Sequence, residues 1–414
     1  MSVSAGAPGP LEGYRVLELG NLIAAPMAGK IFAEFGAEVI KVEHPGVGDE
    51  LRRWRLFRGE ESLMWRTLAR NKKSITLDLA QPEGRAIGLR LVGEADVVLE
   101  NFRPGTLEKW NLGPDVMQLA NPDLILVRIS GYGQSGPYRD RPGFGGIAEA
   151  IGGLRNLTGY PDRPPTRVGI SLGDTVAGMF GVIGALVSLL RREGTRSPAQ
   201  GRSPGAEVVD VALYEAVFAL LEGLLPEYDG YGVIRARTGS SLPGIAPSNT
   251  YPCRGGKWVV IGGNADAIFP RLMEAIGRPD LARAPELQDN PGRSRHQEML
   301  DQAIEAWTSE RTIDETMSAM LAAGVPAGPI YDASDIASDP HFEARGMLAG
   351  HDVEVEAGKT ERVRFPGVVP KLSAHPGAIR WVGPELGQHN DEIYSGRLGL
   401  SPSRLDELRG KGVI

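Results

Sequence analysis

Short apolar runs rich in β-branched residues alternate with helix-like segments along the first third of the chain. From Tyr14 onward the sequence contains RVLELG, then PMAGKIFAEFG, then AEVIKVEHP. The middle run has helical spacing of its apolar residues, and Pro26 suits the first turn of a helix. Strand, helix and strand in this order are typical of parallel strands joined by crossover helices. The pattern therefore limits this region to an α/β fold with a parallel sheet.

The same alternation continues toward residue 135. We predict further strands at SITLDLA, ADVVLENF and DLILVRISGYG, with helices at PEGRAIGLRLVGE and GTLEKWNLG between them. A small-residue segment at 196–205 reads as a surface loop before the strand AEVVDVA and the helix LYEAVFALLEGLLPEY. The sequence thus predicts a Rossmann-like sheet.

The sequence pattern changes near Asp229, where the regular alternation of strands and helices ends. Glycine- and proline-punctuated loops lead into the strand KWVVIGG and several helical stretches between Phe269 and Ala323. This change predicts a second, smaller α/β domain. The tail after VPAGPIYDASDI is mostly extended, with strands at MLAGHDVEVE and ERVRFPGVV and a closing helix at SRLDELRGKGVI.

Charge argues against nucleic acid as the partner. The 45 Lys and Arg residues against 52 Asp and Glu give a net charge of −7, whereas binding to a phosphate backbone needs a basic face. The start of the chain has no basic or apolar signal region, and the apolar stretch from Val176 to Leu190 is interrupted by glycines and falls short of a membrane span. We expect a cytoplasmic protein with neither a nucleic acid nor a membrane as partner.

Metal and nucleotide motifs are missing from the sequence. The single cysteine, Cys253, cannot pair internally, and the six histidines form no H-x-x-H or H-E-x-x-H. We expect no metal site. The turn GNLIAAP after the first strand lacks G-x-G-x-x-G, although Glu43 ends the second strand as an acidic ribose ligand would. NAD or FAD binding is therefore a weaker reading than plain α/β framework.

Two candidate nucleophiles lie in TRVGISLGDTVAGMFGVIGAL. GISLG matches the G-x-S-x-G elbow of hydrolases, with Ser171 as nucleophile. Asp174 lies where an extended segment turns into an apolar helix, and it either caps that helix or acts as an ionised nucleophile near the helix dipole. Glycines at 178, 181 and 184 leave a groove on this helix for another backbone or a flat ligand.

Basic residues gather near predicted loops of the sheet. Arg70, Lys72 and Lys73 precede SITLDLA, and Arg103 and Lys109 lie in ENFRPGTLEKW. Each is commonly a solvated charge, but grouped at the ligand-binding edge of an α/β sheet they suit a ligand that carries phosphates.

With these residues collected, the chain resembles the family III CoA-transferases nearly from end to end. The resemblance runs through LEGYRVLELGNLIAAP, FGAEVIKVEHPGVGDELR, RNKKSITLDL, ADVVLENFRPGTLEKWNLG, ISGYGQSGPYRDRPGF, GISLGDTVAGMFGVIGAL, VVDVALYEAVF and VPAGPIYDASDI. It implies that Asp174 is the catalytic residue, which attacks a thioester and then carries CoA as an aspartyl-CoA thioester. It also implies that CoA is a substrate and that no other cofactor or metal is used.

The resemblance also implies the binding residues. The expected CoA contacts are Ile23, Ala24, His44, Leu77, Asp78, Leu79, Ala80, Asn101, Phe102, Arg103, Lys109, Pro142, Gly143, Phe144 and Gly145. The loop that covers the aspartate in some relatives corresponds to 239–244, with Gly239, Ser240 and Ser241. Some relatives carry a glutamate where this chain has Gly145, which leaves Glu149 as a distant candidate for a second carboxylate.

The resemblance implies an interlocked ring homodimer. Residues 1–225 would form the large CoA-binding domain, 226–330 the small domain, and 331–414 a segment that returns to the large domain. The boundary agrees with the change of texture near Asp229.

Three other functions remain to be separated from CoA transfer. Related α-methylacyl-CoA racemases use a histidine where this chain has Phe144, and phenylalanine cannot move a proton. A serine hydrolase using Ser171 would need a histidine partner, with His341, His351 and His389 as candidates. A non-catalytic CoA-binding protein would bind CoA without exchange activity.

The segment LLPEYDGYGVIRARTGSSLPGIAPSNTYPC resembles the branch that uses succinyl-CoA and small dicarboxylic acids. The unreacted carboxylate of such an acid needs a partner inside a dry site, and Arg235 and Arg237 are the local candidates. The sequence leaves open which diacid is the acceptor and whether transfer occurs between molecules or within one.

Overall fold

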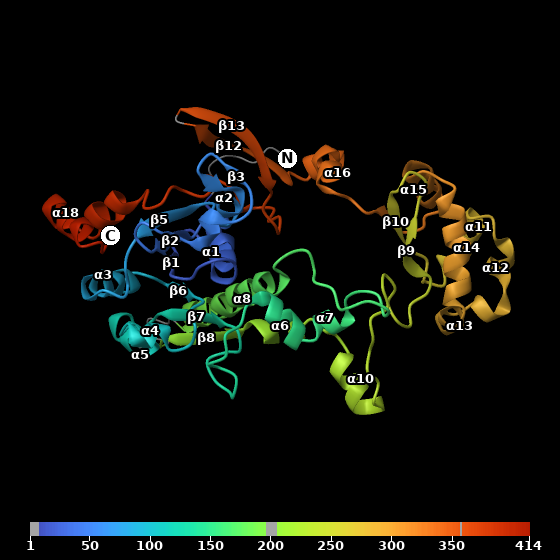
Figure 1. The fold of residues 1–414 in the computed structure, drawn as a ribbon, viewed down its shortest axis with the longest axis horizontal. Coiled ribbons are helices and arrows are strands. Elements are labelled where there is room, and N and C mark those ends of the chain that lie inside the picture. Colours follow the sequence, from blue (N-terminus) through green and yellow to red (C-terminus); the bar gives the residue numbers. More distant parts are fainter. Residues whose placement is uncertain (1–7, 196–204, 357) are drawn as a thin grey trace. The chain divides into compact units, whose positions relative to one another are not determined.

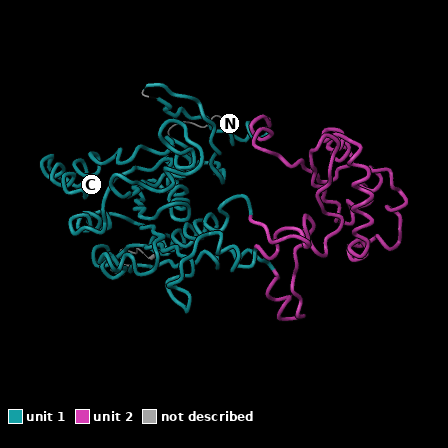
Figure 2. Tube along the Cα trace, in the orientation of Figure 1, with its two compact units in different colours: residues 1–154, 168–222, 341–414 teal, residues 155–167, 223–340 magenta. Residues whose placement is uncertain are grey.

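The computed structural model describes residues 8–195, 205–356 and 358–414. The chain divides into two compact units (Figure 2). Unit 1 comprises residues 1–154, 168–222 and 341–414, and unit 2 comprises 155–167 and 223–340. The segment 155–167 therefore belongs with the second unit, whereas the sequence placed it in the first.

Unit 1 is built on a six-stranded sheet whose strands are all parallel (Figure 1). Its order is β5 (Lys72–Thr76), β2 (Glu38–Glu43), β1 (Arg15–Glu18), β6 (Val97–Glu100), β7 (Ile125–Ser130) and β8 (Glu207–Ala212). Five of these strands fall within runs that predicted them, and β5 overlaps the predicted run SITLDLA but begins two residues before it. The α/β fold class is confirmed.

Helices and short elements connect these strands. The helices are α1 (Ala24–Glu34), α2 (Leu63–Leu68), α3 (Pro82–Val92), α4 (Thr106–Lys109), α5 (Pro114–Ala120), α6 (Gly145–Ile151), α7 (Leu154–Leu157), α8 (Leu172–Thr195) and α9 (Leu213–Phe218). The short elements are η1 (Glu50–Arg53), β3 (Phe57–Arg58) and β4 (Glu61–Ser62).

Both faces of the sheet are covered, which explains the nearly continuous apolar strands. Val16 and Val97 face a core shared with α1 and α8, while Leu17 and Val98, one residue further on, face a core shared with α3 and the C-terminal segment. Successive side chains of a strand point to opposite faces. The helices on the two faces therefore each bury one alternate set of strand residues.

Helix α8 is the central helix of one face. Over Leu172–Gly194 it is long and apolar enough to cross a membrane by length and composition, so the expectation that this stretch falls short is wrong. Its glycines instead allow close packing. A Cβ at Gly178 would lie 2.6 Å from the Ala24 carbonyl oxygen, and one at Gly184 would lie 2.4 Å from Val209. The glycine groove is therefore filled by α1 and the sheet rather than by a ligand.

The helix expected over LYEAVFALLEGLLPEY is broken into α9 and α10 (Leu224–Tyr231). α9 ends at Phe218, and Glu222, with φ of 51° in the left-handed region, lies with Gly223 in the turn that precedes α10. The division between the two units falls at this break, three residues before the expected boundary.

The C-terminal segment belongs to unit 1 from His341 onward. It comprises α17 (Pro340–Ala344), the hairpin β12 (Leu348–Glu356) and β13 (Lys359–Pro366), the π-helical turn η3 (Glu392–Arg397) and α18 (Pro402–Gly410). Tyr394 and Leu408 are fully buried against the sheet core. The Asp78 amide donates to the Val413 carbonyl at 2.8 Å, which joins the end of the chain to the loop after β5.

Unit 2 contains a three-stranded antiparallel sheet in the order β11, β10, β9 (Figure 1). Its strands are β9 (Ser248–Pro252), β10 (Trp258–Gly262) and β11 (Ala327–Pro329). Its remaining helices are α11 (Phe269–Ala275), α12 (Pro279–Arg283), η2 (Pro285–Leu287), α13 (Asn290–Arg295), α14 (Gln297–Ser309), α15 (Ile313–Ala322) and α16 (Ala333–Ser338). Leu272, Ile304 and Met320 are fully buried in its separate core.

Candidate active site

The loop after β1 is held tightly to the loop after β6. The Asn101 side chain donates to the Asn21 carbonyl and accepts from the Asn21 amide, both at 2.8 Å. Gly20 makes this approach possible, because a Cβ there would lie 2.3 Å from the Asn101 Oδ1. Since the carboxyl ends of parallel strands form the usual ligand-binding edge, this clamp shapes the predicted CoA groove.

A buried carboxylate fixes the next residue of the same loop. Asp49 Oδ1 accepts from the amides of Leu22 at 3.0 Å and Leu51 at 2.9 Å, and its Oδ2 lies 2.8 Å from Lys41 Nζ. Leu22 has φ of 64°, which is uncommon for a residue with a side chain. The Lys41 ammonium also donates to the Gly20 carbonyl. The pair Lys41 and Asp49 therefore holds the 20–22 turn in an otherwise unfavourable conformation.

Lys41 belongs to a network of buried charged side chains that extends to Glu18 on β1 and Lys72 on β5. Glu18 lies 3.3 Å from Lys41 and 2.7 Å from Lys72, and all three side chains are at most 1% exposed. Burial lowers the pKa of Lys72 to about 8 despite the neighbouring Glu18. For Lys41, the carboxylates of Asp49 and Glu18 outweigh burial and raise the pKa. Sequence reasoning assigned no role to Lys41 or Asp49, although Asp49 lies in the quoted segment VGDELR.

Asp174 is the third residue of α8 rather than its N-cap. The Thr175 amide donates to the Ser171 carbonyl at 3.0 Å, so Ser171 caps the helix and the N-cap reading of Asp174 is wrong. Asp174 still lies in the first turn, where helix dipoles favour a negative charge. Its side chain is partly exposed, as a nucleophile must be.

The Asp174 carboxylate occupies the space that a side chain at residue 145 would fill. A Cβ at residue 145 would lie 2.1 Å from Asp174 Oδ2 and 3.0 Å from its backbone nitrogen. In this arrangement a side chain at residue 145 would displace the Asp174 carboxylate.

Glu149 approaches the same turn from α6. It is fully buried, and its Oε1 accepts from the Gly173 amide at 3.3 Å. The residue treated as a distant candidate is thus hydrogen-bonded to the immediate neighbour of Asp174. Its position four residues after Gly145, one helical turn along α6, was the signal available in the sequence.

The predicted phosphate-binding cations fall into two groups. The Arg103 and Lys109 side chains are exposed and form no ion pair with any residue of the described ranges. His44 is exposed as well, and its Nδ1 lies 2.9 Å from the Pro45 carbonyl. These three residues follow the carboxyl ends of β2 and β6, as expected.

Arg70, Lys72 and Lys73 do not belong to this group. Arg70 is buried against Glu34, Lys72 against Glu18, and Lys73 pairs with Glu38 at 2.7 Å and Glu392 at 2.6 Å. They begin β5, whereas Leu77 follows its carboxyl end. Because they lie at the amino end of a parallel strand, the prediction that they meet CoA phosphates is wrong.

The remaining predicted contacts differ in what they can offer a ligand. The side chains of Ile23, Leu77 and Leu79 are buried in hydrophobic cores, and Ala24 is buried too, which leaves their backbones. Ala80 is exposed, and its amide donates to Asp78 at 2.9 Å. Phe102 packs edge-on against Trp110 with ring centroids 5.2 Å apart. Pro142 is exposed, Gly143 partly buried, and Phe144 is 67% exposed at the start of α6.

The structure around Ser171 is not the strand-to-helix turn that a serine hydrolase uses to present its nucleophile. Residues 163–170 contain no strand, so Ser171 does not lie on a strand-to-helix elbow. Within residues 8–195, 205–356 and 358–414 no histidine hydrogen-bonds its hydroxyl. The exposed Phe144 ring likewise offers no proton for a racemase.

The substrate-loop candidates all lie in unit 2. Arg235 Nε donates to Glu227 at 2.7 Å, so its charge is already compensated. Arg237 donates to the carbonyls of Tyr160 and Asn156 and has no carboxylate partner in the described ranges. Gly239 has φ of 68° and its amide donates to the Gly159 carbonyl at 3.0 Å.

The loop that follows is held by its own hydrogen bonds. Ser240 donates to Asn249 at 2.5 Å, and the Thr238 and Ser241 hydroxyls each donate to the other's carbonyl. These bonds limit the motion of the loop within unit 2.

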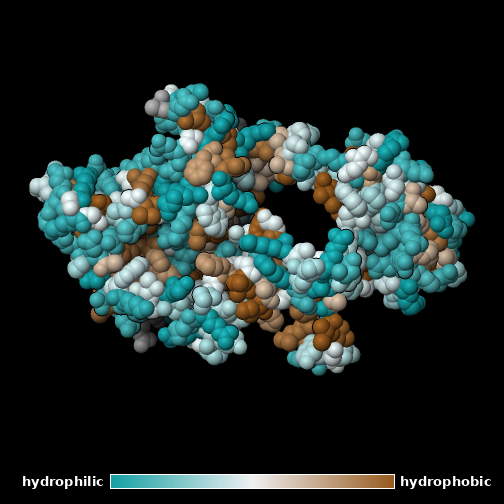
Figure 3. Space-filling model, in the orientation of Figure 1, coloured by the Kyte–Doolittle hydropathy of each residue, from teal (hydrophilic) through white to brown (hydrophobic). Residues whose placement is uncertain are grey.

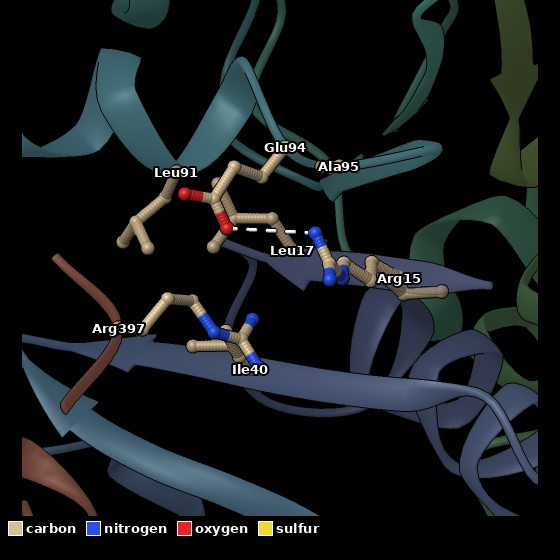
Figure 4. Close-up of a pocket in the computed structure, with 8 residues that line it drawn as sticks. Arg15, Leu17, Ile40, Leu91, Glu94, Ala95 and Arg397 are labelled. Carbon is tan, nitrogen blue, oxygen red and sulfur yellow. Dashed lines mark ion pairs between the residues drawn. The ribbon is translucent and has the colours of Figure 1, made fainter. Parts of the chain in front are cut away.

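The opposite end of β1 offers no comparable site. Arg15 pairs with Glu94 at 3.6 Å beside Arg397 (Figure 4). The hollow there is about 10 Å³, which is room for about one water molecule. Among the described residues no group of three metal-ligating side chains forms a metal site.

Comparison with known proteins defines the class. The model of CoA-transferase family III matches residues 11–390. The chain has the α/β fold of a CAIB/BAIF family protein from Brucella suis, with a TM-score of 0.81 and 31% identity over 94% of this chain and 100% of that one.

Two curated relatives cover nearly the whole chain. The succinyl-CoA–D-citramalate CoA-transferase of Chloroflexus aurantiacus is 52% identical over 98% of each chain. The succinyl-CoA–L-malate CoA-transferase beta subunit of the same organism is 43% identical over 98% of each. The chain belongs to CoA-transferase family III, and the resemblance stated from its motifs is confirmed.

Proposed function

We propose that this protein transfers CoA from succinyl-CoA to a small dicarboxylic acid, with Asp174 as the covalent carrier. The observation that carries the proposal is the Asp174 carboxylate, partly exposed in the first turn of α8 and packed on the bare backbone of Gly145. The 52% identity to a succinyl-CoA–D-citramalate CoA-transferase supports the choice of substrates. CoA is the only cofactor-like molecule that this route needs.

The reaction is two exchanges at one carboxylate. An Asp174 oxygen attacks the thioester carbonyl of the donor and the C–S bond breaks, which releases CoA as a thiolate and forms a mixed anhydride between Asp174 and the donor acyl group. The thiolate attacks the Asp174 carbonyl carbon, the C–O bond breaks, and the donor carboxylate leaves an aspartyl-CoA thioester. The acceptor carboxylate then repeats these steps in reverse, so no water, proton or electron is consumed.

The N-terminus of α8 favours the ionised form of the Asp174 carboxylate, and Glu149 holds the backbone beside it. The α8 dipole favours the anion that attacks. By accepting from the Gly173 amide, Glu149 fixes the backbone that precedes Asp174. We assign Glu149 a positioning role, since its carboxylate holds the backbone of the residue before Asp174.

Different residues are proposed to recognise CoA and the acceptor acid. Exposed Arg103 and Lys109 suit the phosphates of CoA because neither is neutralised by a described carboxylate. Arg237 suits the distal carboxylate of the acceptor for the same reason, whereas Arg235 is committed to Glu227. This choice between the two arginines was open at the level of sequence.

We also propose that the protein works as a homodimer in the cytoplasm. Met179, Ile183, Val187 and Leu190 are 47–73% exposed on one face of α8. In unit 2, Tyr231 at the end of α10 and Ile234 just after it are 86% and 77% exposed, and Figure 3 shows a hydrophobic patch over that helix. Apolar surfaces of this kind usually mark interfaces. Sedimentation of the purified protein as a monomer would contradict the dimer.

The central experiment traps the carrier. Wild-type protein incubated with succinyl-CoA, then digested and weighed, is expected to show CoA attached to the peptide that holds Asp174. Asp174→Asn keeps the size and should lose exchange by several orders of magnitude. Ser171→Ala is the matched control and should remain active. Retained turnover in Asp174→Asn would refute the proposal.

A further inference from the structure

A second cleft lies in unit 1 at the amino end of β5. It measures about 670 Å³, within the range of small-molecule sites, and its lining includes Arg66 of α2, Arg380, Trp381 and His389. The predicted CoA contacts Leu77 to Ala80 follow the other end of β5 and do not line it. The cleft is therefore separate from the CoA groove.

Arg66 is the unusual group in this cleft. Its side chain is only 7% exposed, yet its guanidinium donates no hydrogen bond to any residue in the described ranges, and its Nε is buried without a partner. Its one ion pair there is with Glu385 at 3.9 Å, and the Glu385 side chain is 59% exposed. A buried guanidinium left in this state is unfavourable unless something binds it.

The walls of the cleft are fixed before any ligand arrives. Trp65 Nε1 donates to the Pro384 carbonyl at 2.9 Å, and Trp381 Nε1 donates to the Lys72 carbonyl at 3.0 Å. His389 Nδ1 accepts from the Ser74 amide at 3.1 Å. Because that nitrogen accepts, the neutral ring carries its proton on Nε2, which remains as a donor.

The charged side chains around the cleft limit the chemical class of ligand that can bind there. Arg380 is exposed, and its side chain has no partner in the described ranges. Lys73 is neutralised by Glu38 and Glu392. Exposed Glu354 and Glu385 also line the cleft, so a multiply charged anion would be repelled, whereas hydroxyl or ammonium donors would find acceptors.

We propose that this cleft binds a small monocarboxylate that also carries a hydroxyl or ammonium group, with the carboxylate on Arg66 and Arg380 and the donor group toward Glu385. A planar guanidinium fork matches a carboxylate in two parallel hydrogen bonds. The site does not depend on the proposed transfer reaction and uses none of its residues.

The test titrates the full chain with L-lactate, L-alanine, propionate and inorganic phosphate at millimolar concentration, and follows the indole N–H signal of Trp381 by NMR. Trp381→Phe assigns that signal. We expect lactate or alanine to bind at least about tenfold more tightly than propionate, which lacks the donor, and than phosphate.

Variants locate the binding. Arg66→Lys keeps the charge but loses the planar fork of the guanidinium, and Arg380→Gln changes an exposed side chain that packs in no core. Each should weaken binding about tenfold. Arg278→Gln, at an exposed arginine of unit 2, should bind as the wild type does. Asp174→Asn should also bind normally, which separates this site from the acceptor site.

Three outcomes would overturn the proposal. The first is that none of the four probes shifts the Trp381 signal, which would leave Arg66 as a structural partner of Glu385. The second is that phosphate binds most tightly, which would make the ligand class wrong. The third is that Asp174→Asn abolishes binding, which would place the probe at the transfer site.

Discussion

Replacing Gly145 by alanine tests the geometry at Asp174 most directly. The new Cβ would lie 2.1 Å from Asp174 Oδ2 and 2.6 Å from its Cγ. Ordinary contacts are about 1 Å longer or more, so the carboxylate must move by about that distance, because the neighbouring backbone nitrogen at 3.0 Å leaves little room to share the shift. A displacement of 1 Å from a productive arrangement lowers a rate by on the order of 100-fold.

We therefore expect Gly145→Ala to lose about 100-fold in kcat for CoA exchange. Overpacking should lower the free energy of unfolding by about 1–3 kcal/mol, which leaves a folded protein. Exchange between succinyl-CoA and labelled succinate measures the rate, and urea unfolding measures stability.

Gly169→Ala is the matched control, since a Cβ there has no neighbour within 4 Å and the residue lies five positions before Asp174. It should keep nearly full activity. If Gly145→Ala retains more than about a tenth of wild-type kcat, or if Gly169→Ala loses as much, the assigned contact between Gly145 and Asp174 does not control the reaction.

Three further changes are expected to separate the roles of other residues. Arg103→Gln should raise KM for CoA esters about tenfold while leaving KM for the acceptor unchanged, and equal effects on both would indicate a structural role. Arg237→Met should reduce the preference for short dicarboxylates over propionate by about tenfold, roughly 1.4 kcal/mol, whereas Arg235→Met should act mainly on stability; the reverse pattern would make Arg235 the acceptor ligand. Burial raises the pKa of Glu100 to about 7 despite Arg128, so the folded state binds more protons than the unfolded state between about pH 4.5 and 7, and stability should fall by up to about 3 kcal/mol as pH rises through that window. Glu100→Gln should flatten this part of the curve measured by urea unfolding, and an unchanged slope would exclude Glu100 as its source.

The order and type of the main elements could be predicted from the sequence. Each strand of the parallel sheet is a short apolar run, because both faces of the sheet are buried and nearly every position must be apolar. Asp174 was singled out in the same way, since its local segment combines a helix start with a family motif, and its catalytic role stays a prediction. Local patterns sufficed wherever neighbouring residues carried the signal.

Charged residues were harder to place. Arg70, Lys72 and Lys73 look like solvated or ligand-binding cations, yet Arg70 and Lys72 are buried against Glu34 and Glu18 at the amino end of β5, and the partly exposed Lys73 is also paired with carboxylates. Nothing near them in the sequence reveals those partners, which lie some 35 to 55 residues away. Their place before SITLDLA already puts them at the amino end of the strand, whereas only the pairing of strands and the packing of helices decides which charges they meet.

The sequence by itself determined the parallel α/β sheet and the family, and it singled out Asp174 as the candidate carboxylate, because each of these depends on contiguous residues. Tertiary structure decided what surrounds that carboxylate. Gly145 and Glu149 reach the first turn of α8 because α6 packs against it. The C-terminal segment lies against α2, where the Gly383 amide donates to the Arg66 carbonyl, and the Arg66 guanidinium is buried without a hydrogen bond to any residue in the described ranges. The physical reason is that local patterns fix secondary structure, whereas contacts between distant segments are set by how the helices and strands pack together.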